Sequence, residues 1–174
     1  MKTIAIIGGT GKEGKGLAYR WAKQGYHIVI GSRQAEKAQA AADDIQALLG
    51  NDGKVAGLPN PEAAQQADLL VLTVPYSAHQ AMLESLKPYV QGKIMIDVTV
   101  PLVPPKVTRV QMPPAGSAAQ EAQQILGEGV QVVSAFQNIS YEHLLHDEAV
   151  QCDVLVCGGS KAAREIVLDL VRKA

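Results

Sequence analysis

The amino-acid sequence predicts an α/β fold with a doubly wound, mainly parallel sheet and helices on both of its faces. Short apolar runs alternate with helical patterns along all 174 residues. A glycine-rich turn follows the first apolar run directly. The run at 68–74 (DLLVLTV) is apolar at neighbouring positions, which is typical of a parallel strand buried on both faces. Because no internal repeat or low-complexity tract interrupts the alternation, we expect a single domain over residues 1–174.

The first half of the chain contains four predicted strands, each followed by a helix. We expect the strands at 3–8, 27–31, 54–58 and 68–74, and the helices at 12–24, 35–49, 61–67 and from the fourth strand to about residue 86. Residues 50–53 (GNDG) are a strong stop signal for the second helix. Asn60 is expected to cap the third helix, with Pro61 at its first position.

The second half continues the same sheet. We expect strands at 93–98, 130–136 and 152–157, and helices at 117–126 and 141–146. Ser160 is expected to cap a final amphipathic helix that ends near Arg172. Residues 100–116 contain five prolines and have no clear period, so they are predicted to form a loop or flap.

Composition and charge exclude several kinds of partner. The formal net charge is −1, so nothing attracts nucleic acid or an anionic membrane, and aromatic residues at 4% are too few for a base-stacking surface. No segment approaches the roughly 20 apolar residues of a membrane helix, and the N-terminus has no signal-peptide pattern. Cys152 and Cys157 lie five apart on a predicted strand and fit no metal-site spacing, so we expect buried, reduced thiols and a cytoplasmic location.

The glycine-rich turn has the spacing of a dinucleotide-binding loop. Residues 9–14 (GTGKEG) fit G-x-G-x-x-G between an apolar strand and a helix. Gly9 is expected to make the tight turn, Gly11 to let the backbone approach a pyrophosphate, and Gly14 to let the helix pack closely on the strand. The N-terminus of the helix then offers free N–H groups and a partial positive charge to the phosphates. These features predict a Rossmann-type dinucleotide-binding fold.

The end of the second predicted strand indicates which dinucleotide binds. An NAD-binding protein carries a carboxylate there, which accepts hydrogen bonds from the ribose 2′-hydroxyl. This chain has Ser32 and Arg33 instead, and Lys37 follows four residues later in the next helix. A carboxylate would repel a 2′-phosphate, whereas a guanidinium binds it with paired donors. The sequence therefore favours NADP(H) over NAD(H).

Two other motifs are weighed and set aside. Residues 9–15 also spell G-x-x-x-x-G-K, the start of a triphosphate-binding loop, with Asp97 as a candidate second magnesium ligand. The next position should be Ser or Thr, and it is Gly16. The pattern Tyr-x-x-x-Lys, which many short-chain reductases use for proton transfer, occurs as Tyr19/Lys23 and as Tyr89/Lys93, and we interpret both occurrences as coincidental.

The four histidines show no pairing with a nucleophile and an acid along the chain. We interpret His27, His143 and His146 as surface residues. His79 follows the fourth predicted strand by a few residues, so it is expected either to border the nicotinamide or to lie on a helix surface.

The motifs GGTGKEGKG, GSRxxEKA and TVPY together resemble the NADPH-dependent coenzyme F-420 reductases. The similarity extends to the last helix through VPLVPP at 100–105, SAA at 117–119, VVSA at 132–135 and DVLVCG at 153–158. It implies pyrophosphate contacts by Thr10, Gly11, Lys12 and Glu13, 2′-phosphate contacts by Ser32, Arg33 and Lys37, and a turn near the nicotinamide ribose formed by Val74, Pro75 and Tyr76.

The resemblance implies hydride transfer between NADP(H) and the deazaflavin coenzyme F-420. Both molecules carry their own reactive carbon, so no catalytic side chain and no metal ligand is predicted. Members of the family often carry a His after Ser134-Ala135. This chain has Phe136 there, and Gln137, Asn138 and Ile139 are the predicted substrate-side residues at the carboxyl edge of the sheet.

The family continues beyond the last predicted helix of this chain with a segment that helps to close the deazaflavin site. We therefore expect a second copy, as in a homodimer, or a fused or partner chain to complete that wall. The alternative is a non-catalytic NADP-binding module or a subunit of a larger redox assembly. A dehydrogenase of the 6-phosphogluconate or imine-reductase kind ranks lower, because those enzymes use a helical C-terminal domain.

Overall fold

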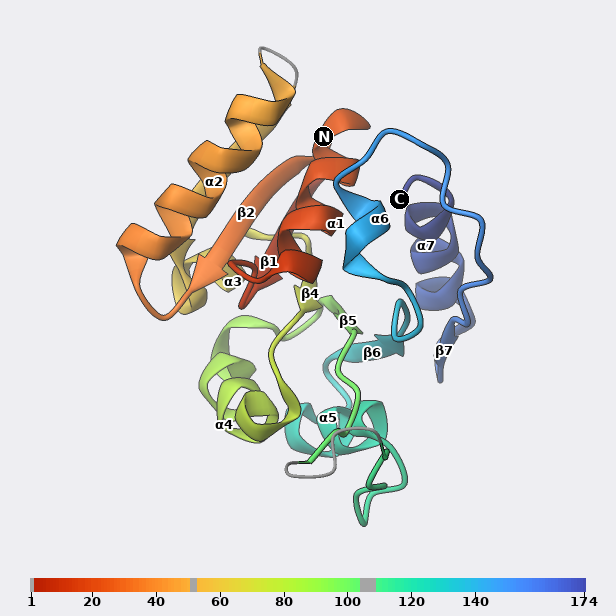
Figure 1. Cartoon of the computed structure of the whole chain (residues 1–174). Coiled ribbons are helices and arrows are strands. Elements are labelled where there is room, and N and C mark those ends of the chain that lie inside the picture. The colour runs from red at the N-terminus through yellow and green to blue at the C-terminus, as the bar shows by residue number, and fades with distance from the viewer. Residues whose placement is uncertain (1, 51–52, 104–108) are drawn as a thin grey trace.

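The computed structural model describes residues 2–50, 53–103 and 109–174, and the described strands form one sheet in the order β3-β2-β1-β4-β5-β6-β7 (Figure 1). Neighbouring strands are parallel except β6 and β7, which are antiparallel. The strands are β1 (Thr3–Ile7), β2 (His27–Ser32), β3 (Lys54–Pro59), β4 (Leu69–Leu72), β5 (Ile94–Asp97), β6 (Gln131–Ser134) and β7 (Cys157–Gly158). The strands are added outward from β1 to β3 on one side and from β4 onward on the other, so the strand order reverses between β1 and β4, which confirms the predicted doubly wound fold.

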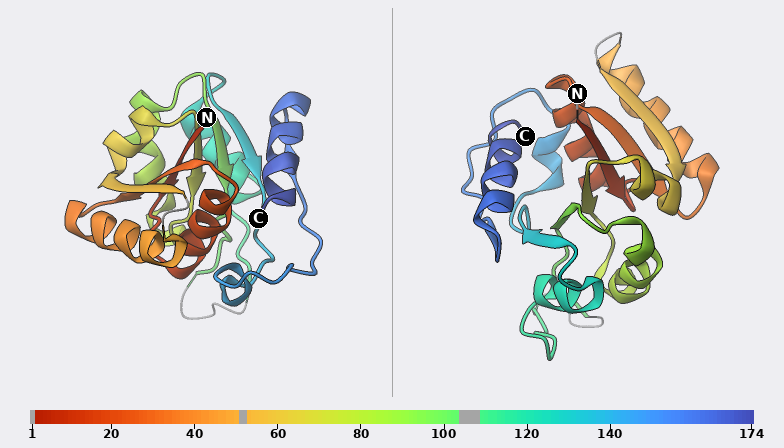
Figure 2. Two further views of the ribbon diagram at one scale, coloured as in Figure 1. Left: turned by 90° about the horizontal axis from the view of Figure 1, so that it is seen from above. Right: turned by 180° about the vertical axis from the view of Figure 1, so that it is seen from behind.

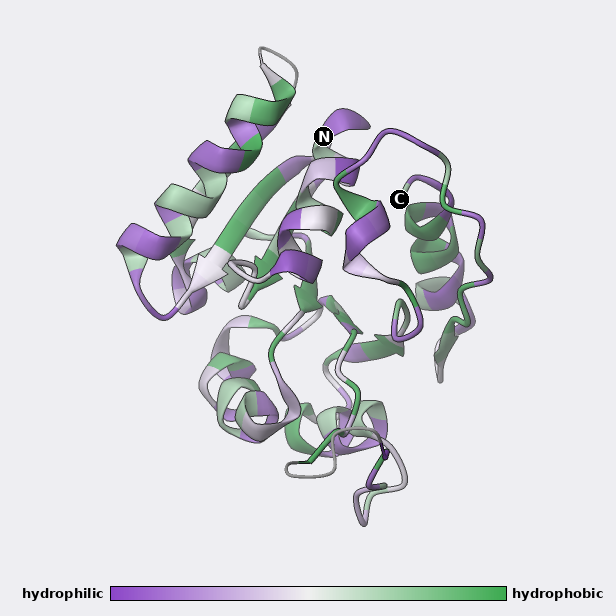
Figure 3. Cartoon of the chain, viewed as in Figure 1, coloured by the Kyte–Doolittle hydropathy of each residue, from purple (hydrophilic) through white to green (hydrophobic). Residues whose placement is uncertain are grey.

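Helices cover both faces of the sheet (Figure 2). They are α1 (Lys12–Lys23), α2 (Ala35–Leu49), α3 (Asn60–Gln66), α4 (Tyr76–Leu86), the 3-10 turn η1 (Lys87–Tyr89), α5 (Ala118–Leu126), α6 (Tyr141–Leu144) and α7 (Lys161–Arg172). One core cluster joins α1, α2 and α7 to one face, and a second joins α3, α4 and α5 to the other. Figure 3 shows the hydrophobic residues concentrated on the central strands, while the helices alternate hydrophilic and hydrophobic bands.

Trp21 ties the first helix to the last. Its ring is fully buried and packs edge-on against Phe136 with 5.7 Å between the ring centroids. The indole Nε1–H donates to the Leu170 carbonyl oxygen at 2.9 Å. A buried Trp normally needs a partner for its N–H, and here α7 supplies it from 149 residues along the chain. The contact places the two ends of the chain on the same face of the sheet.

Most predicted elements are confirmed to within two or three residues, and the helix at 35–49 agrees at both ends. Ser117 and Ser160 cap α5 and α7 by accepting hydrogen bonds from the backbone N–H groups of Gln120 and Ala163. The strand predicted at 130–136 ends at Ser134, because Phe136 adopts a left-handed φ of 71° and turns its ring into the core. Of the predicted stop signal at 50–53, Asn51 and Asp52 lie outside the described residues, as do Pro104 and Pro105 of the proline-rich segment.

Two predictions about the C-terminal region and one about α3 are wrong. The strand predicted at 152–157 is reduced to β7, since Leu155 is 74% exposed and the apolar run is not buried on both faces. Cys152 and Cys157 are free, as predicted, but both are exposed. Asn60 does not cap α3: the capping residue is Pro59, and the Asn60 side chain has a different partner, described below.

Within the described residues, no helix combines the length and the apolar character that crossing a membrane requires.

Candidate functional site

The glycine turn between β1 and α1 is shaped by contacts with two neighbouring strands. The Gly9 N–H donates to the carbonyl oxygens of Ile6 at 3.2 Å and Gly31 at 3.0 Å, which closes the turn against β2. The left-handed residue, however, is Gly8, with a φ of +70°, and a Cβ there would lie 2.6 Å from Val74 Cγ1. The two Gly9 hydrogen bonds are consistent with the expected role of Gly9 in the tight turn, and a Cβ on Gly9 would lie 2.6 Å from the Ile6 carbonyl oxygen. Gly8, to which the sequence analysis gave no role, supplies the left-handed conformation.

Gly11 and Gly14 have opposite surroundings. A Cβ on Gly14 would lie 2.6 Å from the Gly9 Cα, so this glycine lets α1 approach the turn, as predicted. A Cβ on Gly11 would meet nothing within 4 Å. Gly11 is the N-cap of α1 and has no side chain to occupy the first N–H groups of the helix. The N-terminus of α1 therefore presents free backbone donors to open space, which is the arrangement that a pyrophosphate needs.

A cavity of about 360 Å³ opens beside this turn at the carboxyl ends of the central strands. It is lined by Gly8, Thr10, Gly11, Ser32, Arg33, Gln34, Lys37, Asn60, Thr73, Val74, Pro75, Ala78 and Met82. Most of the predicted cofactor residues are thus brought together: Thr10, Gly11, Ser32, Arg33, Lys37, Val74 and Pro75. Parallel α/β sheets bind their ligands at this edge, where the strand order reverses.

The basic corner of the cavity lies at the end of β2. Arg33 and Lys37 are exposed, and among the described residues neither has an acidic partner. Ser32 is only 8% exposed, and its hydroxyl accepts a hydrogen bond from the Gln34 N–H at 3.3 Å. Two exposed cations beside a helix N-terminus fit a ligand that carries a phosphate outside its pyrophosphate, and the position of the NAD-specific carboxylate is occupied by Arg33.

Asn60 is a cavity residue that the sequence analysis missed. Its side chain is 4% exposed, and its Oδ1 accepts from the Gly8 N–H at 3.3 Å. The amide Nδ2 donates to Met82 Sδ at 3.6 Å, and Met82 also lines the cavity. Asn60, the first residue of α3, thus fixes the left-handed glycine from the end of β3, which lies two places from β1 in the sheet. Asn60 directly follows a predicted parallel strand, and residues at that place often line the ligand site, so the sequence did contain a signal for this role. The sequence analysis interpreted Asn60 as a helix cap instead.

The other predicted cofactor residues do not line the cavity. Lys12 Nζ lies 3.4 Å from the Tyr141 hydroxyl and 4.7 Å from the centroid of that ring. Glu13 Oε1 is buried and has no hydrogen-bond partner among the described residues, and burial raises the pKa of Glu13 to about 7. Tyr76 donates its hydroxyl to Glu121 at 3.4 Å. Roles for Lys12, Glu13 and Tyr76 toward the cofactor remain predictions.

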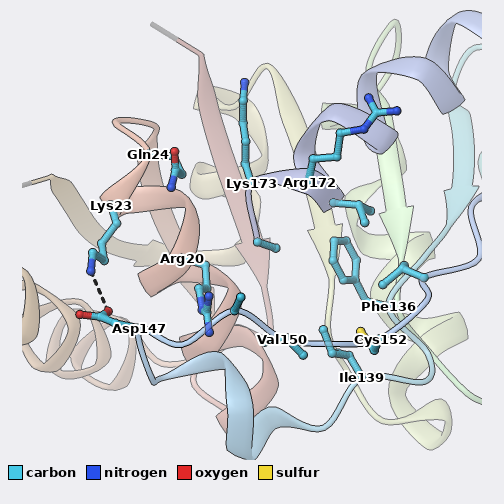
Figure 4. A pocket seen from close by; sticks show the side chains of 14 residues that line it. Arg20, Lys23, Gln24, Phe136, Ile139, Asp147, Val150, Cys152, Arg172 and Lys173 are labelled. Carbon is cyan, nitrogen blue, oxygen red and sulfur yellow. Dashed lines mark hydrogen bonds and ion pairs between the residues drawn. The ribbon is translucent and has the colours of Figure 1, made fainter.

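The three predicted substrate-side residues are not brought together. Gln137 Nε2 donates to the Asp97 carbonyl oxygen at 2.7 Å, and Asn138 Nδ2 donates to the Asp153 carbonyl oxygen at 2.6 Å. Ile139 lines a second cavity, of about 530 Å³, between α1 and the C-terminal helix (Figure 4). Only Gln137 lies at the carboxyl end of β5, close to the turn that lines the first cavity.

Several charged groups in and beside the second cavity already have partners within the chain. Lys23 Nζ and the Tyr19 hydroxyl both lie 2.7 Å from Asp147 Oδ1, and Figure 4 shows the Lys23–Asp147 pair. Arg20 donates to the backbone carbonyl oxygens of His143, Leu144 and Glu148. These contacts fasten the segment after β6 to α1. The Tyr19/Lys23 pair is therefore structural, in agreement with its interpretation as a coincidental motif.

Replacing Tyr19 by Phe should accordingly leave turnover within about twofold of the unchanged protein. The substitution removes one hydrogen bond to Asp147 and keeps the packing of the ring, and the hydroxyl does not face the first cavity. Steady-state rates with NADPH measure this directly. A loss of a hundredfold or more in kcat, with the thermal unfolding temperature unchanged, would identify Tyr19 as a proton donor and contradict the structural interpretation.

The structure also assigns other roles to the residues of the triphosphate motif. Gly16 packs directly against the side chain of Leu144, so α6 occupies the space that a Ser or Thr hydroxyl would need. Asp97 is fully buried and pairs with His79 Nε2 at 2.9 Å. The positions of Gly16 and Asp97 therefore do not form the magnesium site of a triphosphate-binding loop.

His79 lies neither on a helix surface nor against the first cavity. Its side chain is fully buried, with Nε2 at 2.9 Å from Asp97 Oδ2 and Nδ1 at 3.2 Å from Glu121 Oε2. Burial lowers the pKa of His79, but the hydrogen bonds and negative charges of Asp97 and Glu121 outweigh it, and the pKa is raised above its ordinary value. The expectation of a surface position is wrong, because α4 turns this residue toward the end of β5.

Comparison with known proteins gives a consistent result. A family model described as "NADP oxidoreductase coenzyme F420-dependent" matches residues 3–101. The F420-dependent NADP reductase of Methanocaldococcus jannaschii is 42% identical over 98% of this chain and 78% of its own length. The enzyme of the same name from Methanothermobacter thermautotrophicus is 43% identical over 98% of this chain and 76% of its own length.

Solved structures share the fold. A crystal structure from Arthrobacter sp. FB24, whose description names an F420-dependent NADP-reductase, superposes with a TM-score of 0.80 at 24% identity, over all of this chain and 81% of the other. The NADP-bound pyrroline carboxylate reductase of Plasmodium falciparum has a TM-score of 0.63 at 15% identity, over 99% of this chain and 55% of the other. At these identities the structural likeness establishes the fold.

Proposed function

Because the chain belongs to the family of coenzyme F420-dependent NADP oxidoreductases, we propose that it transfers a hydride between NADP(H) and the deazaflavin coenzyme F-420. Near full-length identity above 40% to two reductases of that name carries the proposal. The cavity beside the glycine turn supports it, because Gly11 is open, the first N–H groups of α1 face the cavity side, and Arg33 has no acidic partner within the described part of the chain, all of which suit NADP(H).

The roles that we propose for the cavity residues follow from their positions. The N–H groups at Thr10, Gly11 and the first turn of α1 bind the pyrophosphate. Ser32, Arg33 and Lys37 bind the 2′-phosphate, and Val74 with Pro75 orients the nicotinamide ribose. When bound, NADPH supplies the hydride from its own nicotinamide ring, and the chain has to place that ring against the acceptor and exclude water.

We propose that the protein acts in the cytoplasm and that a second chain completes the deazaflavin wall. Two exposed free cysteines suit a reducing compartment. Among the described residues, Gln137, Asn138 and Ile139 do not close a common cavity with Val74 and Pro75. A second copy in a homodimer, or a fused or partner chain, would supply the remaining wall.

The test is a direct assay of the purified protein. NADPH and oxidised F-420 are mixed, the F-420 absorbance is followed, and NADH serves as the matched control. We expect the absorbance to fall with NADPH and to fall far more slowly with NADH. Tight NADPH binding without any reaction would refute hydride transfer to F-420 and favour the alternative of a non-catalytic NADP-binding module. Absence of NADPH binding would refute the cofactor assignment itself.

A further inference from the structure

A histidine held between two carboxylates lies beneath the turn that lines the cofactor cavity. Both ring nitrogens of His79 face carboxylate oxygens, those of Asp97 at 2.9 Å and Glu121 at 3.2 Å. An ionised carboxylate only accepts hydrogen bonds, and a neutral imidazole donates from only one nitrogen. Toward two ionised carboxylates, both contacts are therefore hydrogen bonds only when the ring carries two protons. A positive charge on His79 makes the buried arrangement self-consistent.

The titratable groups around the ring come from three elements. In the described residues, Asp97 faces the ring from the end of β5 and Glu121 from α5. On α4 itself, Tyr76 lies with its ring centroid 5.8 Å from that of His79 and donates its hydroxyl to the same Glu121 carboxylate. Glu121 is 23% exposed, whereas His79 and Asp97 are completely buried. The cluster therefore joins the first turns of α4 to both β5 and α5.

The same cluster also fixes the chain just before α4. Asp97 Oδ1 accepts from the Thr99 N–H at 3.0 Å, and the Thr99 hydroxyl donates to the Val74 carbonyl oxygen at 3.4 Å. The other oxygen, Oδ2, accepts from His79 on α4. The Asp97 carboxylate therefore holds both ends of the Val74–Pro75 turn. Thr99 links it to the Val74 carbonyl oxygen at the start of the turn, and His79 links it to α4, which follows the turn. Val74 and Pro75 are also the residues that line the cofactor cavity.

We propose that His79, bridging Asp97 and Glu121, is a positioning residue that shapes the Val74–Pro75 turn to receive the nicotinamide half of NADP(H). The inference rests on the proposed function, because that function assigns the ligand of the turn. His79 does not line the cavity and acts through the backbone of the turn. A neutral ring donates to only one of the two carboxylates, so α4 loses its hydrogen bond either to Asp97 at the end of β5 or to Glu121 on α5, and the turn is held less firmly.

The first test compares the affinity for NADPH with the affinity for 2′,5′-ADP, which is the adenosine half of the cofactor. His79→Gln keeps a polar side chain but donates toward only one of the two carboxylates. We expect its NADPH affinity to fall about tenfold, as for the loss of a charged hydrogen bond. The affinity for 2′,5′-ADP, which lacks the nicotinamide half, should stay unchanged, because Arg33 and Lys37 lie at the other end of the cavity. Equal losses for both ligands, or no loss for either, would overturn the proposal.

The second test measures how NADPH affinity depends on pH, because the pH sets the charge on the His79 ring. Since the charged form is the one that anchors the turn, NADPH affinity should be complete below the raised pKa of His79 and decrease as the pH rises through it. Glu121→Gln keeps an acceptor but removes a negative charge, so it lowers the pKa of His79 and moves the decrease to lower pH. Glu13, with a pKa of about 7, titrates in every variant and cancels in the comparison.

Two further measurements distinguish a failure of the positioning role from a loss of protein stability and from a failure of the proposed function. The ¹⁵N NMR signals of His79 in the ligand-free protein should show both ring nitrogens protonated at neutral pH. Glu121 is partly exposed, so Glu121→Gln remains informative if His79→Gln does not fold. An unshifted pH profile in Glu121→Gln, or a neutral His79 ring, would refute the positioning role. Failure of the unchanged protein to bind NADPH would instead refute the proposed function.

Discussion

Replacing Arg33 by Ala should weaken NADPH binding by about 10- to 100-fold, the size expected for a lost charged hydrogen bond to phosphate, and should leave NADH binding within about twofold. Arg33 lines the cavity at the end of β2, is exposed, and among the described residues has no acidic partner, so removing it leaves no buried charge behind. The whole effect should therefore appear in the ligand that carries a 2′-phosphate. Fluorescence titration with both nucleotides measures it.

Two matched variants sharpen this experiment. Arg33→Lys keeps the charge but loses the paired donors, so its NADPH affinity should be intermediate. Lys161→Ala removes an exposed cation on α7, outside the cavity, and should leave both affinities unchanged. If Arg33→Ala weakens NADPH and NADH equally, Arg33 does not contact the 2′-phosphate, and the preference for NADP(H) has to come from another group.

Replacing Gly11 by Val should weaken the binding of NADPH and NADH by more than about 100-fold, because the new side chain would occupy the space of the pyrophosphate. The fold should be largely preserved. Gly11 has an extended backbone, with φ −76° and ψ 167°, which valine adopts readily, and a Cβ there meets nothing within 4 Å. Titration calorimetry and thermal unfolding of the same sample separate the two effects.

Gly14→Ala is the matched control for this prediction. A Cβ at Gly14 would lie 2.6 Å from the Gly9 Cα and 2.9 Å from the Gly9 carbonyl oxygen. Backbone has to move to make room, so we expect this smaller substitution to lower the unfolding temperature as well as the affinity. Gly11→Val should lower the affinity alone. Normal dinucleotide binding by Gly11→Val would show that the ligand does not pass over the N-terminus of α1.

The sequence predicted the fold and one half of the site from signals that act over short distances. Hydrophobic periodicity predicted the order of strands and helices, because each pattern depends on residues within one element. The glycine spacing at 9–14 and the pair Ser32-Arg33 predicted the phosphate-binding residues, because the turn between a strand and a helix fixes their positions relative to the sheet edge. The strands predicted at 130–136 and 152–157 were too long, because the left-handed turn at Phe136 and the exposure of Leu155 are not visible in an apolar run.

The tertiary structure alone decided the contacts between distant elements. Asn60 bonds to a glycine 52 residues earlier, and His79 is enclosed by carboxylates 18 and 42 residues later. Gly16 is explained by Leu144, which follows it by more than a hundred residues. No local pattern encodes these partners, since a buried polar side chain finds its hydrogen bonds only after the helices and strands around it have packed together.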